Sequence, residues 1–498
     1  ICASYPKANI WIIPSVESPQ VYRNYAQTSK VHLDMARGEV EHIQLVFPSK
    51  VNEEYRFTFD RNLKGIQISA RELKKMNGYY DALVPFKNQL KCTDTLTAVW
   101  ITVQCPSRVP VGKYHQTIKI EGSKHFTIQL DYNVHHTTIP LKSSIPITVG
   151  VENRCVAEGL NDKEADKERQ RWVDFVLSYR MTPVFGTQIT PERWQYEHSF
   201  SPWAWNDKRS IRLLNDRRYS CYMLPFFTLS ENELASLLCN IQKKGKLKES
   251  LFYIWDEPAY MEDYEQIKQK VNIIRKYASD ARILTTFFCG PRNGPRKGDL
   301  YAVFDYLKHH IHVATISLAP CKGNEEEVQH IRYKVPEGID WWSYVCWQPG
   351  GNEPNFLLQM KGIQQRAIMW RTWKNGSQGF LYWNCNIYHK RNPFTYITDM
   401  PHGDGILIYP GDILGRKGPI ASARLERWRD GAEEMELLRL VEKNYSKEKA
   451  DTLLNIVYSS PLSFIEKAHN IPFFRKELLD QLDKTIPIDY KLRITDFI

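Results

Sequence analysis

Eight apolar runs between Pro146 and Asn386 most constrain what this chain can fold into. Each run is nearly continuous in hydrophobicity, which is typical of parallel strands buried on both faces. Stretches of helical periodicity lie between the runs, and eight βα repeats are the number that closes a (β/α)8 barrel. We therefore predict a (β/α)8 TIM-type barrel, with a doubly wound open sheet as the alternative. The runs read PITVGVEN, MTPVFGTQ, YMLPFFTL, LFYIWDEP, RILTTFFCG, VATISLAP, WWSYVCWQP and QGFLYWNCN.

The N-terminal part of the chain has a different pattern. In IKIEGSKHFTIQLDYNV, apolar and polar residues alternate on both sides of Gly122 and Ser123, which is typical of a hairpin. No long helical period accompanies these short strands, so a β-sandwich is the simplest prediction. The chain is thus predicted to be multidomain, with an N-terminal all-β sandwich accessory domain at 1–143, the barrel at 144–443 and a C-terminal helical extension at 444–498 packed on the barrel.

Composition and short motifs exclude several classes of protein. The 498 residues include 67 basic and 57 acidic ones, so the net charge is +10, but the charges are interspersed and no nucleic-acid-binding motif accompanies them. No apolar stretch approaches the length of a membrane span. The basic, glycine-rich stretch GPRNGPRKGD has neither the spacing nor the lysine-hydroxyl ending of a phosphate loop. The ten cysteines form no CxxC motif and have no histidine partners at zinc spacing.

Tryptophan is concentrated in the predicted barrel, where 12 of the 14 tryptophans follow residue 145. A large core rich in aromatic residues would account for this. A cleft lined by flat apolar faces, suited to a sugar or another ring-shaped ligand, would account for it equally well.

Two adjacent acids, Asp256 and Glu257, follow directly after the fourth apolar run. The active site of a (β/α)8 barrel lies at the carboxyl ends of its strands. An unpaired carboxylate at the end of a buried strand is costly or takes up a proton, so this placement predicts an active site. We expect Pro258 to keep Glu257 extended and to stop strand pairing beyond it. The alternative is that Asp256 caps the next helix while Glu257 faces solvent.

Two carboxyl groups in different environments can have separated pKa values, and glycoside hydrolysis commonly uses such a pair. The usual retaining and inverting enzymes hold the two acids apart on separate elements. Adjacent acids fit better the exception in which the 2-acetamido group of the substrate is the nucleophile. One acid would then orient the acetamide, and the other would protonate the leaving oxygen and later activate water.

Other aromatic and polar side chains stand at the ends of the seventh and eighth runs and in the loop beyond. Aromatic faces stack on pyranose rings, and amide side chains pair with hydroxyls. Each tryptophan alone is equally consistent with core packing, and Asp404, between two glycines, with a tight turn. The residues that we predict to bind substrate are Trp347, Gln348, Trp383, Asn384, Asp404 and Tyr409.

Three motifs together resemble glycoside hydrolase family 123: WDEP after the fourth run, then GDGILIYPG and GPIASARLERWRDGAEEMELL far downstream. The resemblance covers roughly residues 145 to 445, and the β-rich N-terminal part is similar to the accessory sandwich of that family. It implies a retaining β-N-acetylgalactosaminidase that uses substrate-assisted catalysis. By the same resemblance, Asp256 orients the acetamido group and Glu257 is the general acid/base, with no metal and no organic cofactor.

The expected function is therefore exo-hydrolysis of terminal β-linked N-acetylgalactosamine on glycans or glycolipids. A non-catalytic glycan-binding protein, and a β-hexosaminidase of different sugar specificity, are the alternatives. No signal peptide is present at Ile1. We expect a leader to have been removed and the protein to be secreted, periplasmic or at the cell surface.

Overall fold

The computed structural model describes residues 10–60, 63–190, 195–395 and 401–485. The chain divides into two compact units, which are taken separately below. The first comprises Ile1–Pro140, Leu358–Trp370 and Ile420–Ile498, and the second comprises Leu141–Leu357 and Arg371–Pro419. Among the described residues, no helix is both long and apolar enough to cross a bilayer.

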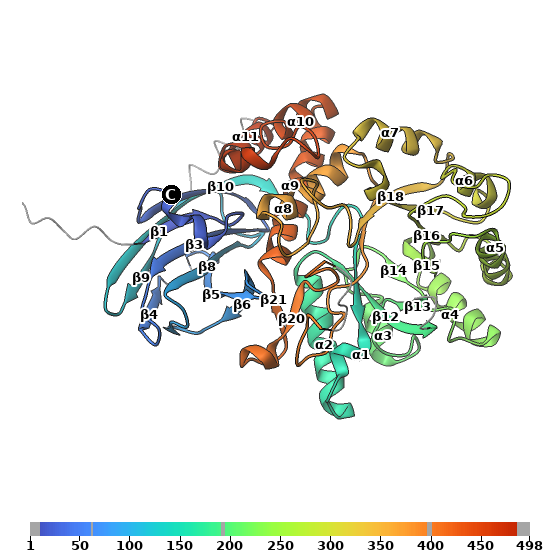
Figure 1. Cartoon of the computed structure of the whole chain (residues 1–498), viewed down its shortest axis with the longest axis horizontal. Coiled ribbons are helices and arrows are strands. Elements are labelled where there is room, and N and C mark those ends of the chain that lie inside the picture. The colour runs from blue at the N-terminus through green and yellow to red at the C-terminus, as the bar shows by residue number, and fades with distance from the viewer. Residues whose placement is uncertain (1–9, 61–62, 191–194, 396–400, 486–498) are drawn as a thin grey trace, which may run out of the picture. The chain divides into compact units, whose positions relative to one another are not determined.

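The second unit is built on a nine-stranded sheet in which all eight predicted runs form strands (Figure 1). Eight strands run parallel, and β13 is antiparallel to β12. The strands are β11 (Ile147–Glu152), β12 (Thr182–Thr190), β13 (Gln195–Ser199), β14 (Tyr222–Met223), β15 (Ser250–Trp255), β16 (Ile283–Phe287), β17 (Val313–Ser317), β18 (Asp340–Val345) and β19 (Phe380–Tyr382).

The strand order, β13-β12-β11-β19-β18-β17-β16-β15-β14, is that of a barrel because the first parallel strand pairs with the last. A doubly wound sheet has no such pairing, so that alternative is excluded. No ladder joins β12 to β14 among the described residues. Instead, the amide of Phe200, just after β13, donates to the carbonyl of Met223 at 2.7 Å. The predicted barrel is therefore a nearly closed, mostly parallel sheet.

The interior of this sheet is a packed apolar core. Strands β15, β16 and β17 are buried along their whole length, which explains why the sequence runs are continuously apolar. Inward-facing side chains from seven strands meet in one cluster: Val184, Met223, Leu251, Tyr253, Leu284, Val313, Trp342, Tyr344 and Leu381.

Helices follow the strands, as the periodicity predicts. In α4, for example, Leu234, Leu237, Leu238 and Ile241 share one buried face, and Ser230 and Glu233 form a capping box at its start. The helices of this unit lie around the outside of the strands (Figure 1). They are α1 (Asn153–Ala157), α2 (Asp162–Ser178), α3 (Lys208–Leu213), α4 (Glu231–Lys243), α5 (Met261–Arg275), α6 (Ala302–Leu307) and α7 (Glu325–Lys334).

The first unit contains the predicted sandwich, with sheet orders β1-β3-β8-β5-β6 and β2-β10-β9-β4-β7 around a shared apolar core. The predicted hairpin is confirmed: β9 and β10 pair antiparallel from Glu121 and His125 onward. The strands are β1 (Trp11–Pro14), β2 (Lys30–Arg37), β3 (Glu39–Pro48), β4 (Glu54–Phe59), β5 (Gln67–Met76), β6 (Tyr79–Pro85), β7 (Gln89–Lys91), β8 (Leu96–Cys105), β9 (Gly112–Glu121) and β10 (His125–Thr138).

The division of the chain differs from the predicted domains at the C-terminal end. We expected a boundary at 443/444 and an extension packed on the barrel. Instead, everything from Ile420 onward belongs to the compact unit of the sandwich, and α11 packs against β2 and β10. The remaining elements are α8 (Gly362–Lys374), the short strands β20 (Ile408–Pro410) and β21 (Pro419–Ala421), α9 (Ala423–Asn444), α10 (Lys447–Leu454) and α11 (Ile471–Asp483).

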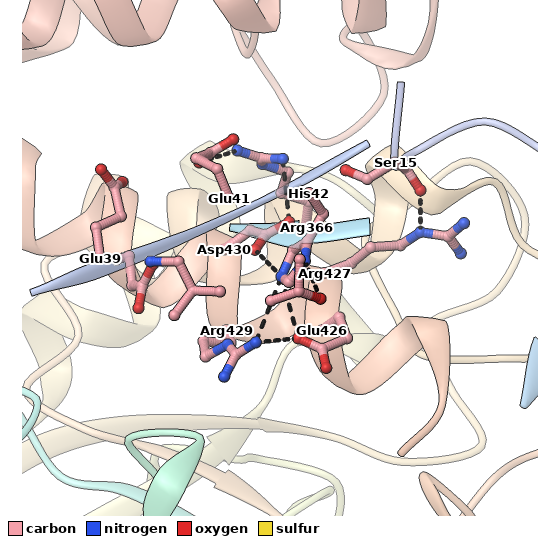
Figure 2. A network of polar contacts seen from close by, with 12 residues as sticks. Ser15, Glu39, Glu41, His42, Arg366, Glu426, Arg427, Arg429 and Asp430 are labelled. Atoms are coloured by element: carbon pink, nitrogen blue, oxygen red, sulfur yellow. Dashed lines mark hydrogen bonds and ion pairs between the residues drawn. The ribbon is translucent and has the colours of Figure 1, made fainter. Parts of the chain in front are cut away.

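Charged pairing explains why α9 belongs there. Its residues 423–438 are buried although many are charged, and buried charges need partners. The carboxylate of Glu426 lies 3.1 Å from Nε2 of His42 and 2.6 Å from Nη1 of Arg71. Asp430 lies 3.2 Å from both His42 and Arg366 (Figure 2). This part of the family-like motif RLERWRDGAEEMELL therefore forms a network of ion pairs within the first unit.

Candidate active site

A cavity of about 520 Å³ opens at the carboxyl ends of the parallel strands in the second unit. Its walls come from β11, β12, β15, β16, β18 and β19 and the segments that follow them, which is where a barrel of this kind places its active site. The polar residues of the wall are Thr148, Tyr196, His198, Tyr253, Asp256, Glu257, Thr286, Arg292, Tyr344, Tyr382, Asn384 and Asp404, and the tryptophans are Trp347 and Trp383.

Asp256 follows the last residue of β15, and two hydroxyl groups hold its carboxyl group. Its Oδ1 accepts hydrogen bonds from Tyr253 at 2.7 Å and from Thr286 at 2.8 Å. The carboxyl group is accessible from the cavity, yet protein atoms crowd around it. Burial raises the pKa of Asp256, and the two hydrogen bonds oppose that rise. The helix-capping alternative fails, because Tyr260 is the N-cap of α5.

Glu257 was predicted to be extended, and the structure corrects this. Its φ is +44°, in the left-handed region that non-glycine residues seldom adopt. The Thr286 hydroxyl stabilises the turn by accepting a hydrogen bond from the Glu257 amide at 2.9 Å. Neighbouring residues of a strand point to opposite faces. The left-handed turn breaks that alternation, so both adjacent acids line the same cavity.

The carboxyl group of Glu257 is half-buried and accepts a hydrogen bond from the hydroxyl of Tyr344, on β18. Burial and the neighbouring charge of Asp256 raise the pKa of Glu257 to about 7, against the Tyr344 hydrogen bond and the charge of Arg292. The two acids are thus held mainly by neutral hydroxyl groups. A carboxyl group with this pKa is largely protonated below about pH 7, as a general acid requires.

A third carboxyl group, that of Asp404, is held on the opposite wall. Its Oδ1 accepts hydrogen bonds from Tyr382 at 3.1 Å and from the indole of Trp383 at 3.0 Å. Gly403 and Gly405 both have positive φ, so Asp404 does sit in a tight turn, and that turn directs its side chain toward the cavity. Asp404 can therefore both belong to a tight turn and be available to bind substrate.

The sequence profile of the glycoside hydrolase 123 catalytic domain matches residues 167–441, more than half of the chain. This chain belongs to glycoside hydrolase family 123. Its resemblance to that family, inferred above from the WDEP and C-terminal motifs, is confirmed. No curated protein sequence matches the chain significantly.

Among solved structures, a family 123 glycoside hydrolase from Clostridium perfringens, studied for glycolipid glycan hydrolysis, superposes with a TM-score of 0.64 at 13% identity, over 98% of this chain and 100% of that one. This likeness supports the fold. A Bacteroides ovatus GH5 xyloglucanase matches at a TM-score of 0.27 and 11% identity, over 81% of this chain and 98% of that one. A GH2 β-galacturonidase from Eisenbergiella tayi matches at a TM-score of 0.34 and 8% identity, over 80% of this chain and 90% of that one. The last two scores are too low to carry an argument.

In this family 123 chain, six of the eight predicted site residues line the cavity: Asp256, Glu257, Trp347, Trp383, Asn384 and Asp404. Gln348 and Tyr409 are not part of the described cavity wall. The side chain of Tyr409 is fully buried, and its ring lies 6.1 Å from that of Phe394. No group of three or more His, Cys, Asp or Glu side chains arranged to hold a metal occurs in the described part of the chain.

Sequence reasoning missed the hydroxyl groups that hold the acids: Tyr253, Thr286 and Tyr344. All three lie inside apolar runs and face the interior. A polar group on the inner side of a buried strand is the signal that could have found them, because such a group needs a partner. His198 was missed because β13 was not predicted. Its ring stacks on Tyr253 at 4.2 Å, and burial lowers its pKa to about 4.

Proposed function

We propose that this family 123 member is a retaining exo-β-N-acetylgalactosaminidase that removes terminal β-linked N-acetylgalactosamine from glycans or glycolipids, with the 2-acetamido group of the substrate as nucleophile. One observation carries the proposal: two adjacent acids line one cavity, and each is held by a different set of hydroxyl groups. Hydrolysis with a protein nucleophile would instead need the two carboxyl groups on either side of the scissile bond.

Asp256 is suited to orient the acetamide. Among the described residues, both hydrogen bonds to its side chain fall on Oδ1, which leaves Oδ2 to accept the acetamide N–H. A carboxylate at that position increases the electron density on the acetamide carbonyl oxygen. That oxygen then attacks the anomeric carbon as the bond to the leaving oxygen breaks, and a cyclic oxazolinium intermediate forms.

Glu257 is suited to move the proton. With a pKa of about 7, it can give its proton to the leaving oxygen in the first step. In the second step the ionised carboxylate takes a proton from the water that attacks the anomeric carbon. The intermediate opens, the acetamide is restored, and Glu257 regains its proton. Two inversions at the anomeric carbon give net retention.

The cavity walls support a sugar ligand. The partly exposed indole face of Trp383 can stack on a pyranose ring, and the Asp404 carboxylate can accept hydrogen bonds from ring hydroxyls. The glycolipid study of the Clostridium perfringens relative supports the substrate class. We also propose that the protein is secreted, periplasmic or at the cell surface, where such glycans are found.

The test compares aryl β-glycosides of N-acetylgalactosamine, N-acetylglucosamine and galactose with one aglycone. We expect fastest hydrolysis of the first and none of the third, because galactose lacks the acetamide nucleophile. Equal rates on the galactoside would exclude the mechanism. A thiazoline analogue of the cyclic intermediate should inhibit competitively, whereas lack of inhibition would contradict the proposal. Binding of these sugars without any turnover would favour a glycan-binding protein.

A further inference from the structure

The basic stretch GPRNGPRKGD, which fits no phosphate loop, contributes one residue to the cavity wall. This residue is Arg292, in the segment between β16 and α6. It is the one Lys or Arg side chain on the described cavity wall, beside the three carboxyl groups of Asp256, Glu257 and Asp404. A neutral terminal sugar offers a guanidinium group no charge to pair with, so the position of Arg292 needs another account.

The chain fixes Arg292 beside the catalytic segment. Its amide donates to the carbonyl of Ala259 at 2.6 Å, two residues after Glu257. The next residue, Asn293, accepts a hydrogen bond from the amide of Met261 at 2.8 Å, at the start of α5. These contacts tie the loop to the segment that follows the acid pair, so the backbone at Arg292 is held in place.

The guanidinium group of Arg292 is exposed and has no carboxylate partner among the described residues. Its polar side-chain neighbours are the hydroxyl of Tyr260 and the thiol of Cys289. A guanidinium group has five N–H donors in a planar fork that matches a carboxylate or sulfate. Donors therefore remain for an anionic ligand that enters the cavity.

Two observations support a position of Arg292 on the side of the leaving group. Its positive charge lowers the pKa of the Glu257 carboxyl group, and in the mechanism proposed above Glu257 faces the leaving oxygen. At the same mouth lies Trp347, which is 41% exposed and is stacked beside Phe288 with ring centroids 6.5 Å apart. An exposed indole face and a guanidinium group that line the same cavity suit a sugar ring that carries a negative charge.

We propose that Arg292 and Trp347 form a subsite for an aglycone sugar with an anionic substituent, either the carboxylate of a uronic acid or a sulfate ester. The proposal rests on the function proposed above and specifies its substrate class. The indole would stack on the aglycone ring, and the guanidinium group would pair with its anion. Neutral aglycones would still enter the cavity but would lose the ion pair.

The experiment uses disaccharides in which β-linked N-acetylgalactosamine is joined to a uronic acid, to the methyl ester of the same uronic acid, or to a neutral hexose with and without a sulfate ester. The methyl ester keeps the ring and removes the charge. We expect wild-type kcat/KM to favour the acid over its ester by about tenfold, the scale of one charge-assisted hydrogen bond. A preference only for the sulfated hexose over the unsulfated one would identify the sulfate ester as the anion. A preference only for the uronic acid over its methyl ester would identify the carboxylate.

Arg292→Met should bring the acid-to-ester ratio close to one, and Arg292→Lys should restore part of it. Lys297→Met is the matched control, since it removes a positive charge from the same loop but outside the cavity wall, and it should keep the wild-type ratio. The preference should also weaken with salt, because the pair is exposed. Equal rates on every charged and uncharged pair in the wild type, or an unchanged ratio in Arg292→Met, would overturn the inference.

Absence of turnover on every disaccharide would refute the proposed function instead. Calorimetric binding of the acid and its ester then tests the subsite alone. Tighter binding of the acid, lost in Arg292→Met, would support the anionic subsite, and equal binding would overturn it.

Discussion

Two pairs of acidic residues in this protein are surrounded by protein atoms, but one pair has mainly neutral partners and the other has cationic partners. Asp256 and Glu257 in the cavity are held mainly by hydroxyl groups, and their pKa values are raised. Glu426 and Asp430 in α9 lie beside arginines and a histidine (Figure 2). Burial would raise the pKa values of these two as well, but the positive charges outweigh burial and lower them.

The difference teaches that the partner decides what a recessed acid can do. A hydroxyl group can stabilise either protonation state, so Glu257, whose pKa is raised to about 7, can gain and lose its proton near neutral pH. A cation stabilises only the ionised state, so the α9 acids stay charged and contribute to the fold. Substitutions that remove one acid from each group should therefore separate activity from stability.

The largest effect is expected for Glu257→Gln, which removes the mobile proton. Loss of general acid catalysis should lower kcat/KM by about 10²- to 10⁴-fold on a poor leaving group such as a sugar, and much less on dinitrophenol, which needs little protonation. Steady-state kinetics on both substrates checks this.

Thermal unfolding is the control for Glu257→Gln. A carboxyl group whose pKa is raised by folding destabilises the fold as the pH rises through that pKa. Glu257→Gln should therefore be no less stable than wild type at pH 8. Equal losses on both leaving groups would contradict the assigned role.

Asp256→Asn should lower kcat by about 10²- to 10³-fold, the scale found for removal of one group that stabilises developing charge. The loss should persist with dinitrophenol, because the acetamide must attack the anomeric carbon whatever the leaving group is. The surface variant Asp412→Asn serves as the control and should retain wild-type kcat. Full recovery of the Asp256→Asn rate with dinitrophenol would mean that Asp256 does not act on the acetamide.

Glu434, one turn after Asp430 in α9, also pairs with arginines, and Glu434→Gln should lower stability rather than activity. The Glu434 carboxylate accepts from Arg366 at 2.5 and 3.0 Å and from the indole of Trp370 at 2.7 Å. Removing one member of a buried ion pair leaves the other uncompensated, so the free energy of unfolding should fall by about 3 kcal/mol. Denaturant unfolding measures this, with Glu257→Gln as the matched substitution in the cavity. Equal stability of the two variants would contradict a stabilising role for the α9 acids that the cavity acids do not share.

The smallest effect is expected for Tyr344→Phe, which removes the hydroxyl group that donates to Glu257. That hydrogen bond favours the ionised form, so its loss should raise the pKa of Glu257 above the wild-type value of about 7. Wild-type kcat/KM should fall as the pH rises through about 7, and in the variant this fall should shift to higher pH, with a loss of about tenfold or less at the optimum. Tyr132→Phe, in the sandwich, should leave the profile unchanged. A shift to lower pH would contradict the geometry.

The sequence predicted the eight parallel strands and the position of the acid pair, because burial on both faces leaves a local apolar pattern. It did not predict that Thr286 and Tyr344 would contact the pair. Those contacts depend on the register between β15, β16 and β18, which local patterns do not determine. The extended backbone expected at Glu257 was wrong because a hydrogen bond from another strand outweighed the local preference before proline. The partners of α9 were also missed, because His42 and Arg366 lie far from α9 in the chain and local patterns do not determine such contacts.

Thr286 acts together with the WDEP motif, although it lies 29 residues after Glu257 in the sequence. Its single hydroxyl group contacts the side chain of one acid and the backbone of the other, so the two acids cannot be repositioned independently. A WDEP motif placed in another barrel would lack the hydrogen bonds of Thr286. We expect such a barrel to be inactive unless a threonine is also introduced on the adjacent strand. We therefore expect a hydroxyl-bearing residue at this position to be a stricter criterion for activity among related sequences than the two acids alone.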